Sequence, residues 1–191
     1  KLIISGSINQ IPNNSFKNNL SLTQIILNTN SLNYIRESAF NGCSFLSKIW
    51  LPYSLSYIET DAFQGIKKLI ISGEIWQIPN NSFKNCLSIS KIEFDTKNLT
   101  TIKSSAFEGC TSLTEIIIPS SLQKIERNAF KGIKKLIING EVQKIPNESF
   151  KNCSSLSKII INSKEIRSIG SSAFEGCSSL TEITFSSSIN T

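Results

Sequence analysis

Residues Cys110-Thr-Ser-Leu-Thr-Glu-Ile-Ile-Ile-Pro-Ser-Ser-Leu-Gln-Lys-Ile-Glu-Arg-Asn-Ala-Phe130 form one unit, and variants of it fill the 191-residue chain. The Phe that ends the unit recurs at positions 16, 40, 63, 83, 107, 130, 150 and 174. The intervals between these Phe positions run 24, 23, 20, 24, 23, 20 and 24. Self-similarity with a period of about 20 to 50 residues is the sequence signature of a solenoid or another stacked-repeat architecture.

The three interval lengths recur in order, so three units together form a larger repeat. Lys1-Leu-Ile-Ile-Ser-Gly recurs as Lys68-Leu-Ile-Ile-Ser-Gly and again as Lys135-Leu-Ile-Ile-Asn-Gly. We therefore predict a single repeat domain over residues 1–191, with triplets at 1–67 and 68–134 and a truncated third triplet at 135–191. Because the chain contains no Met and starts inside the repeat pattern, we expect it to be a fragment of a longer array.

Apolar residues lie at fixed distances before each Phe. Within one unit, Ile116 and Ile118 are two residues apart, which is the period of a β-strand. Short strands that recur in this way cannot bury an apolar face alone, but stacked neighbours can. We predict a solenoid with a parallel β-sheet of about nine short strands on one face, and short helical turns and loops on the other. The segment Pro79-Asn-Asn-Ser-Phe83 exemplifies the expected helical turns, since Pro is favoured at the first helical position.

The units that end at Phe83 and Phe150 are shorter than the others, and we call them the short units. We align them so that Leu69 and Ile71 take the inward positions that Ile49 and Leu51 take in the preceding unit. This alignment predicts that the short units lack three residues before the strand. It also predicts unbroken columns of equivalent residues along the sheet.

The unit from Cys110 through Pro119 to Ala129-Phe130 resembles the BspA-like class of leucine-rich repeats, also called the Treponema pallidum type. The resemblance covers essentially the whole chain and implies a leucine-rich-repeat solenoid. Proteins of this family are typically surface or secreted molecules of bacteria and parasitic protists, implicated in adhesion and binding. The resemblance therefore implies a location at the cell surface or outside the cell.

Several function classes are disfavoured by what the sequence lacks. It has no His, so no Ser-His or Cys-His nucleophile pair and no imidazole metal ligand can form. It has no Gly-x-Gly-x-x-Gly or phosphate-binding loop. No apolar run approaches the roughly 18 residues that a membrane-spanning helix needs. We expect a non-catalytic protein that uses no cofactor and has no membrane-spanning segment in this window.

The cysteines occupy a position that other units fill with an apolar residue. Each lies three residues after a Phe, where Ile66 and Ile133 lie in the short units. Cys in such a position behaves as a small buried hydrophobe. No Cys-x-x-Cys motif is present. We expect buried free thiols and no metal site. The five residues are Cys43, Cys86, Cys110, Cys153 and Cys177.

The outward positions of the strands form the candidate binding surface. One predicted column is mostly apolar, and a second, two residues earlier, is mostly Lys. Ile on a pleated surface is explained by β-propensity, and Lys by protection of the sheet against aggregation. A long exposed apolar stripe also marks interaction sites. The candidate partner-binding residues are Ile26, Lys48, Trp50, Lys68, Ile70, Lys91, Glu93 and Ile117.

The leading hypothesis is a protein- or glycan-binding adhesion module that uses this outward strand face. The formal charge of +6 and the Lys column favour an acidic or amphipathic protein partner. The sequence disfavours nucleic acid, because it contains little Arg and few aromatic residues for base stacking. The alternative is an intracellular structural scaffold or spacer rod, cytoplasmic or cytoskeletal, built from the same repeats.

Overall fold

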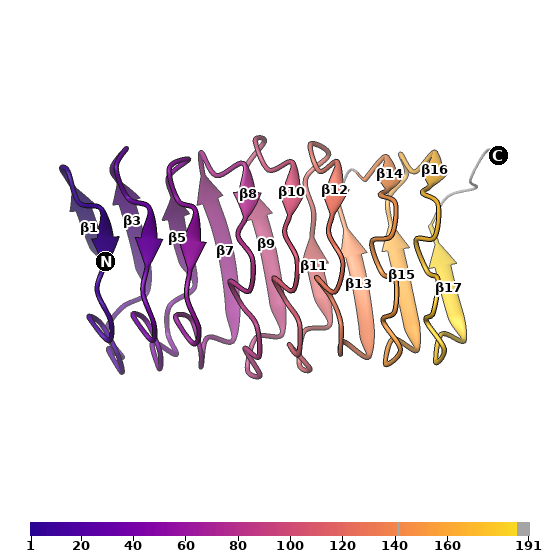
Figure 1. The fold of residues 1–191 in the computed structure, drawn as a ribbon, viewed down its shortest axis with the longest axis horizontal. Coiled ribbons are helices and arrows are strands. Elements are labelled where there is room, and N and C mark those ends of the chain that lie inside the picture. The colour runs from indigo at the N-terminus through magenta and orange to yellow at the C-terminus, as the bar shows by residue number, and fades with distance from the viewer. Residues whose placement is uncertain (141, 187–191) are drawn as a thin grey trace.

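A wide parallel sheet runs the length of the molecule. The computed structural model describes residues 1–140 and 142–186. Nine strands, one from each coil, pair in chain order, which confirms the predicted sheet, and Figure 1 shows them side by side along the long axis. The strands are β1 (Leu2–Ser5), β3 (Gln24–Asn28), β5 (Lys48–Leu51), β7 (Lys68–Gly73), β9 (Lys91–Asp95), β11 (Glu115–Ile117), β13 (Lys135–Asn139), β15 (Lys158–Asn162) and β17 (Glu182–Phe185).

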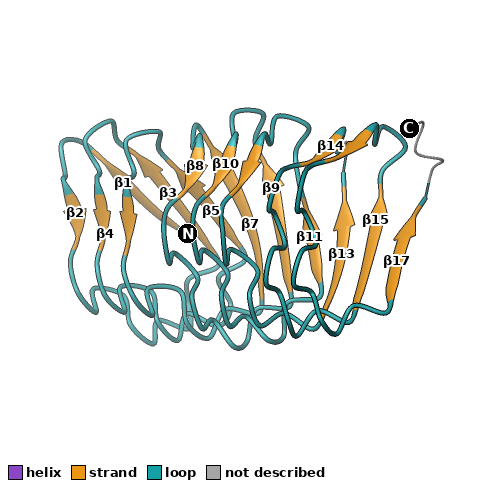
Figure 2. Cartoon of the chain, turned by 45° about the vertical axis from the view of Figure 1, so that its right-hand side comes forward, coloured by secondary structure: helices purple, strands orange, loops and turns teal. Residues whose placement is uncertain are grey.

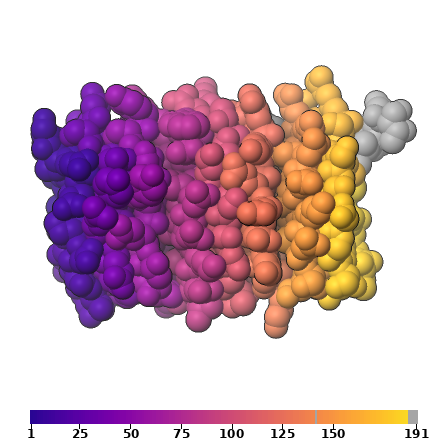
Figure 3. Space-filling model, viewed as in Figure 1, coloured from indigo at the N-terminus to yellow at the C-terminus, as the bar shows by residue number. Residues whose placement is uncertain are grey.

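Two-residue strands form a second layer opposite the wide sheet, as Figure 2 shows. They pair in parallel in three separate groups: β2-β4-β6, β8-β10-β12 and β14-β16. Figure 3 shows the coils packed against one another as successive bands along the long axis. The strands are β2 (Gln10–Ile11), β4 (Tyr34–Ile35), β6 (Tyr57–Ile58), β8 (Gln77–Ile78), β10 (Thr101–Ile102), β12 (Lys124–Ile125), β14 (Lys144–Ile145) and β16 (Ser168–Ile169).

The recurring Phe residues form a continuous aromatic stack inside the solenoid. From Phe16 to Phe174, each ring stacks on the ring of the next coil, with centroids 5.2–5.6 Å apart. Inward Ile and Leu side chains of the wide sheet, such as Ile49 and Leu51, are fully buried in the same core. The apolar positions identified in each repeat unit therefore line one core that is continuous from coil to coil.

The prediction of short helical turns is wrong, because the described residues contain no helix. Asn81 and Asn85, on either side of Phe83, have left-handed backbones with φ of 59° and 57°. An α-helix cannot contain such residues, and Asn tolerates this conformation better than most. The N–H of Phe83 donates to the carbonyl of Ala106 in the next coil at 2.8 Å, and that of Asn85 donates to Glu108 at 2.8 Å. These N–H groups therefore bond between coils and not within a helix.

The predicted alignment of the short units is also wrong. Ile49 of β5 lies opposite Ile71 of β7, and not opposite Leu69. The same shift of two residues recurs between β11 and β13. The shortened connection from Phe63 brings the chain onto the sheet earlier. A shift of two is the smallest that keeps inward side chains inward, because side chains alternate with a period of two.

A Gly lies at the end of each shifted strand, where no other residue could replace it without strain. Gly73 has φ of 113°, and a Cβ on it would lie 2.3 Å from the carbonyl oxygen of Leu51. Gly140, its equivalent in the third triplet, has φ of 121° and makes the same close approach to Ile118. The register shift therefore depends on a close contact between backbones that only Gly permits.

Candidate binding surface on the outward strand face

The eight predicted partner-binding residues all lie on the outward face of the wide sheet, on strands β3, β5, β7, β9 and β11. They are exposed or half-buried, whereas the residues that alternate with them are buried. Strand geometry explains this, because successive side chains point to opposite faces of a sheet. These eight side chains are therefore in reach of solvent.

The register shift divides this face into staggered rows, so the predicted unbroken columns do not form. Trp50 lies opposite Ser72 and not opposite Ile70, while Lys48 lies opposite Ile70 and not opposite Lys68. The eight candidate residues fall in three rows. The first is Ile3, Ile26, Trp50, Ser72 and Asp95; the second is Gln24, Lys48, Ile70, Glu93, Ile117, Asn139 and Asn162; the third is Lys68, Lys91, Glu115, Ile137, Ile160 and Thr184.

The first row contains three adjacent apolar side chains, two exposed and one half-buried. We call Ile3, Ile26 and Trp50 the N-terminal strand patch. Ile3 is 57% exposed and Trp50 is 41% exposed, and Ile26 lies between them in the register. The next residues of the row are polar: Ser72 is buried and its hydroxyl donates to the carbonyl of Ile49, and Asp95 follows it on β9. The predicted apolar stripe is thus divided between rows, and the N-terminal strand patch is its part on the first three coils.

The lysines of the face are largely paired with carboxylates. Lys91 Nζ lies 2.7 Å from Glu115, and Lys158 Nζ lies 2.6 Å from Glu182 on the neighbouring strand. The hydrogen bond to Glu115 raises the pKa of Lys91, and the hydrogen bond from Lys158 lowers the pKa of Glu182. Lys48 reaches Asp95 at 3.5 Å. The outward face therefore carries charges of both signs along the sheet, and Lys48 lies on the same strand as Trp50.

Sequence reasoning missed an aromatic cluster on the opposite layer. Tyr34 and Tyr57 stack with their centroids 4.8 Å apart, and the guanidinium of Arg36 lies 4.3 Å from the Tyr34 centroid. Arg36 also pairs with Glu59 at 2.6 Å. The signal was present in the sequence, since Tyr34 and Tyr57 precede the Ile of the short strand in adjacent units. Because Arg36 is committed to Tyr34 and Glu59, the cluster ties neighbouring coils together.

The five thiols are free, and four of them are buried. Burial raises the pKa of Cys110 and of Cys153 to about 12 in each case. The Cys110 thiol donates to the carbonyl of Phe83, with Sγ and the oxygen 2.9 Å apart. These cysteines therefore act as small core side chains, as the shared Ile position predicts.

Alkylation should distinguish Cys177 from the other cysteines. In native protein at pH 8, we expect iodoacetamide to modify the half-buried Cys177 first, because only a thiolate in reach of solvent reacts. Cys43, Cys86, Cys110 and Cys153 should react only in denaturant. Peptide mass spectrometry after timed quenching measures this order. Early modification of Cys110 in native protein would contradict the burial described here.

The described residues contain neither a metal-binding cluster nor a membrane-spanning helix. Across residues 1–140 and 142–186, no three or more His, Cys, Asp or Glu side chains are grouped so as to hold a metal ion. Over the same residues, no helix has the length and apolar character needed to cross a membrane.

Comparison with known proteins identifies the repeat. The family model for the BspA type leucine-rich repeat region matches residues 1–75 and 76–191 with six copies. The T. pallidum leucine-rich repeat protein is 22% identical, with 94% of this chain and 77% of that chain covered and a TM-score of 0.45. TLR13 in complex with ssRNA13 is 18% identical, with 88% of this chain and 25% of that chain covered and a TM-score of 0.55.

A leucine-rich cell surface protein from Faecalibacterium prausnitzii is 17% identical, with 95% of this chain and 77% of that chain covered and a TM-score of 0.30. A search of curated proteins found no match. The family model spans the full sequence, and it agrees with the coil length, the parallel sheet and the stacked Phe core. The chain therefore belongs to the BspA-type leucine-rich repeat family.

Proposed function

We propose that this chain is a non-catalytic binding module that docks a protein partner on its outward strand face. The observation that carries the proposal is the N-terminal strand patch, in which Ile3, Ile26 and Trp50 lie in one row on adjacent strands. Exposed apolar side chains that are contiguous mark interaction sites more often than single ones do. The partner chemistry that fits is an amphipathic protein surface.

Trp50 is the feature that β-propensity alone does not explain. Ile on the outward face of a sheet fits the pleated surface and covers its neighbours. An indole that is 41% exposed adds a large apolar surface with a hydrogen-bond donor at its edge. Trp is enriched among the residues that contribute most to protein interfaces. We therefore assign Trp50 as the anchor of the proposed interface.

The charged side chains around the patch set its specificity. Lys48, on the strand of Trp50, pairs with Asp95, which follows Ser72 in the same row as Trp50. Mixed charges at an interface rim select partners and orient them more than they add affinity. The partner surface should thus carry both signs of charge around an apolar centre. A location at the cell surface or outside the cell, which the family resemblance implies, is part of the proposal.

Affinity capture with matched variants tests the proposed interface. Wild-type protein, an Ile26→Glu/Trp50→Glu double variant and a Leu87→Glu control would be immobilised and incubated with the same cell extract. Leu87 is 55% exposed but lies in a turn away from the wide sheet, so the control also replaces an exposed apolar side chain by a carboxylate.

We expect the wild type and Leu87→Glu to capture the same proteins, and the double variant to retain them at least tenfold less by quantitative mass spectrometry. Truncating a central interface anchor commonly costs about 2 kcal/mol or more, which is consistent with such a loss. Equal capture by all three proteins would refute docking on the patch. Exclusive capture of further copies of the chain itself would favour the scaffold hypothesis.

A further inference from the structure

The layer of short strands is interrupted at two places, which are equivalent positions in successive triplets. Strand β6 does not pair with β8, and β12 does not pair with β14. Where short strands do pair, the N–H after the second residue donates to the previous coil, as Glu126 does to Ile102 at 2.9 Å. The residues in this position after the two interruptions are Pro79 and Pro146. Proline has no N–H, so this bond cannot form there.

The second interruption leaves two backbone carbonyls without a partner among the described residues. The carbonyl of Thr100 accepts bonds from Gln123 and Lys124 of the next coil, at 2.9 and 3.0 Å. One coil later, the carbonyls of Gln123 and Ile125 are equivalent to those of Thr100 and Ile102. Within the described residues, no backbone N–H donates to either carbonyl. Backbone carbonyls are obligatory acceptors, so a donor from solvent or from a ligand must satisfy them.

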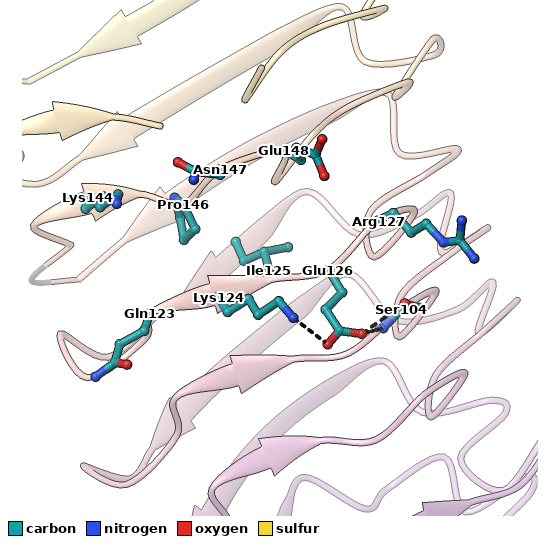
Figure 4. Close-up of a pocket in the computed structure, with 10 residues that line it drawn as sticks. All are labelled: Ser104, Gln123, Lys124, Ile125, Glu126, Arg127, Lys144, Pro146, Asn147 and Glu148. Carbon is teal, nitrogen blue, oxygen red and sulfur yellow. Dashed lines mark hydrogen bonds and ion pairs between the residues drawn. The ribbon is translucent and has the colours of Figure 1, made fainter. Parts of the chain in front are cut away.

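A groove lies beside these carbonyls, and we call it the β12–β14 groove. Its volume is about 660 Å³, which is within the range of small-molecule sites. Figure 4 shows residues 123–127 along one side and Lys144 with residues 146–148 along the other, while Ser104 lies below them. The lining is largely polar, and the two apolar residues that border it, Ile125 and Pro146, are themselves buried.

Among the described residues, the carboxylates of the groove have ion-pair partners, whereas two of its cations do not. Glu126 is held by Lys103 at 3.4 Å and Lys124 at 3.1 Å, and the Ser104 hydroxyl donates to it at 3.0 Å. Glu148 pairs with Lys151. In the described part of the chain, Arg127 and Lys144 have no ion-pair partner. The groove therefore combines two uncommitted cations with two open carbonyl acceptors.

We propose that the β12–β14 groove binds an acidic sugar. Its hydroxyl groups would donate to the carbonyls of Gln123 and Ile125, and its carboxylate would accept a hydrogen bond from Lys144 at one end of the groove or from Arg127 at the other, as Figure 4 places them. A single sugar ring supplies several hydroxyl donors and one anion within the volume of the groove. This site is on the layer opposite the proposed protein interface, so either proposal can fail without the other.

The first interruption is a natural control within the same chain. Its residues are found one triplet earlier in the sequence. Tyr57 is equivalent to Lys124, Thr60 to Arg127, and Gln77 to Lys144. The first interruption therefore has the same proline and the same missing strand pairing, but none of the three cations. We expect an acidic sugar to bind at the second interruption and not at the first.

Titration followed by ¹⁵N–¹H NMR tests the site with defined probes. D-glucuronate should shift the amide signals of residues 123–127 and 144–148, with weak affinity, while D-glucose should bind at least fivefold more weakly. The Arg127→Gln/Lys144→Gln variant should lose at least fivefold in glucuronate affinity. A Lys17→Gln variant, which removes an exposed lysine far from the groove, should bind as the wild type does.

The opposite results would overturn the proposal. Absence of shifts in the groove, equal binding of glucose, or unchanged affinity in the double variant would each exclude an acidic-sugar site. If acetate binds as tightly as glucuronate, the groove is a general anion site and does not recognise the sugar. A tetraglutamate peptide that binds more tightly than glucuronate would indicate an acidic peptide instead.

Discussion

Replacing Gly73 by Ala is expected to lower the free energy of unfolding by about 3 kcal/mol or more. The left-handed backbone alone costs a non-Gly residue about 1–2 kcal/mol. The added Cβ would also lie 2.3 Å from the Leu51 carbonyl oxygen and 2.9 Å from the Leu51 nitrogen. Both are backbone atoms, so no side-chain rotation can relieve the contact. Urea denaturation followed by circular dichroism measures the loss.

Gly6 provides a matched control for this substitution, because it is the equivalent of Gly73 one triplet earlier. It has φ of 93°, but nothing lies within 4 Å of where its Cβ would be. Gly6→Ala should therefore cost only the backbone strain, about 1–2 kcal/mol. Gly140→Ala should match Gly73→Ala. If Gly6→Ala and Gly73→Ala cost the same, the close approach of the backbones would contribute nothing to stability.

Replacing Phe107 by Ala is expected to destabilise the protein by about 3–5 kcal/mol, the usual range for a buried Phe. Phe107 is fully buried, stacks on Phe83 and Phe130, and meets the edge of Phe94. Its removal would leave a cavity between two rings that belong to different coils. The same denaturation experiment measures the effect.

Phe16 is the matched control for the aromatic stack. It is only partly buried and stacks on Phe40 alone among the described residues. Phe16→Ala should therefore cost less than half as much as Phe107→Ala. Equal costs would contradict a core in which each coil is stabilised by the neighbours on both of its sides.

The features that depend on local pattern could be predicted from the sequence. The two-residue spacing of Ile116 and Ile118 indicates a strand wherever it occurs, because side-chain direction alternates with every residue. The sharing of one position by Ile66 and Cys43 indicates a buried position, since both are small enough and apolar enough to fill it. Nine strands and a core of stacked Phe follow once such units are repeated.

The helical turns were mispredicted because the same residue types serve two structures. Asn and Ser before Phe83 are favoured at helix N-termini, but Asn is also favoured in the left-handed conformation that Asn81 adopts. What decides between them is the acceptor of the Phe83 N–H, which is Ala106 in the next coil. A pattern within one unit does not contain that information.

The staggered rows on the strand face could not be predicted for a related reason. The number of residues missing from a short unit is visible in the sequence, but the shift between paired strands is not. The close approach of Gly73 to Leu51 accompanies that shift. Charge pairing depends on it as well, because Lys48 meets Asp95 only across the intervening strand β7. All eight candidate residues lie on the predicted face, but in different rows.

Photo-cross-linking from individual positions tests partner docking on the strand face most directly. The photoreactive amino acid p-benzoylphenylalanine would replace Trp50 in one protein and Leu87 in another, and each would be irradiated with the captured partner. We predict covalent adducts with the partner from position 50 and none from position 87. Adducts from position 87 alone, or from both positions equally, would contradict docking on the N-terminal strand patch.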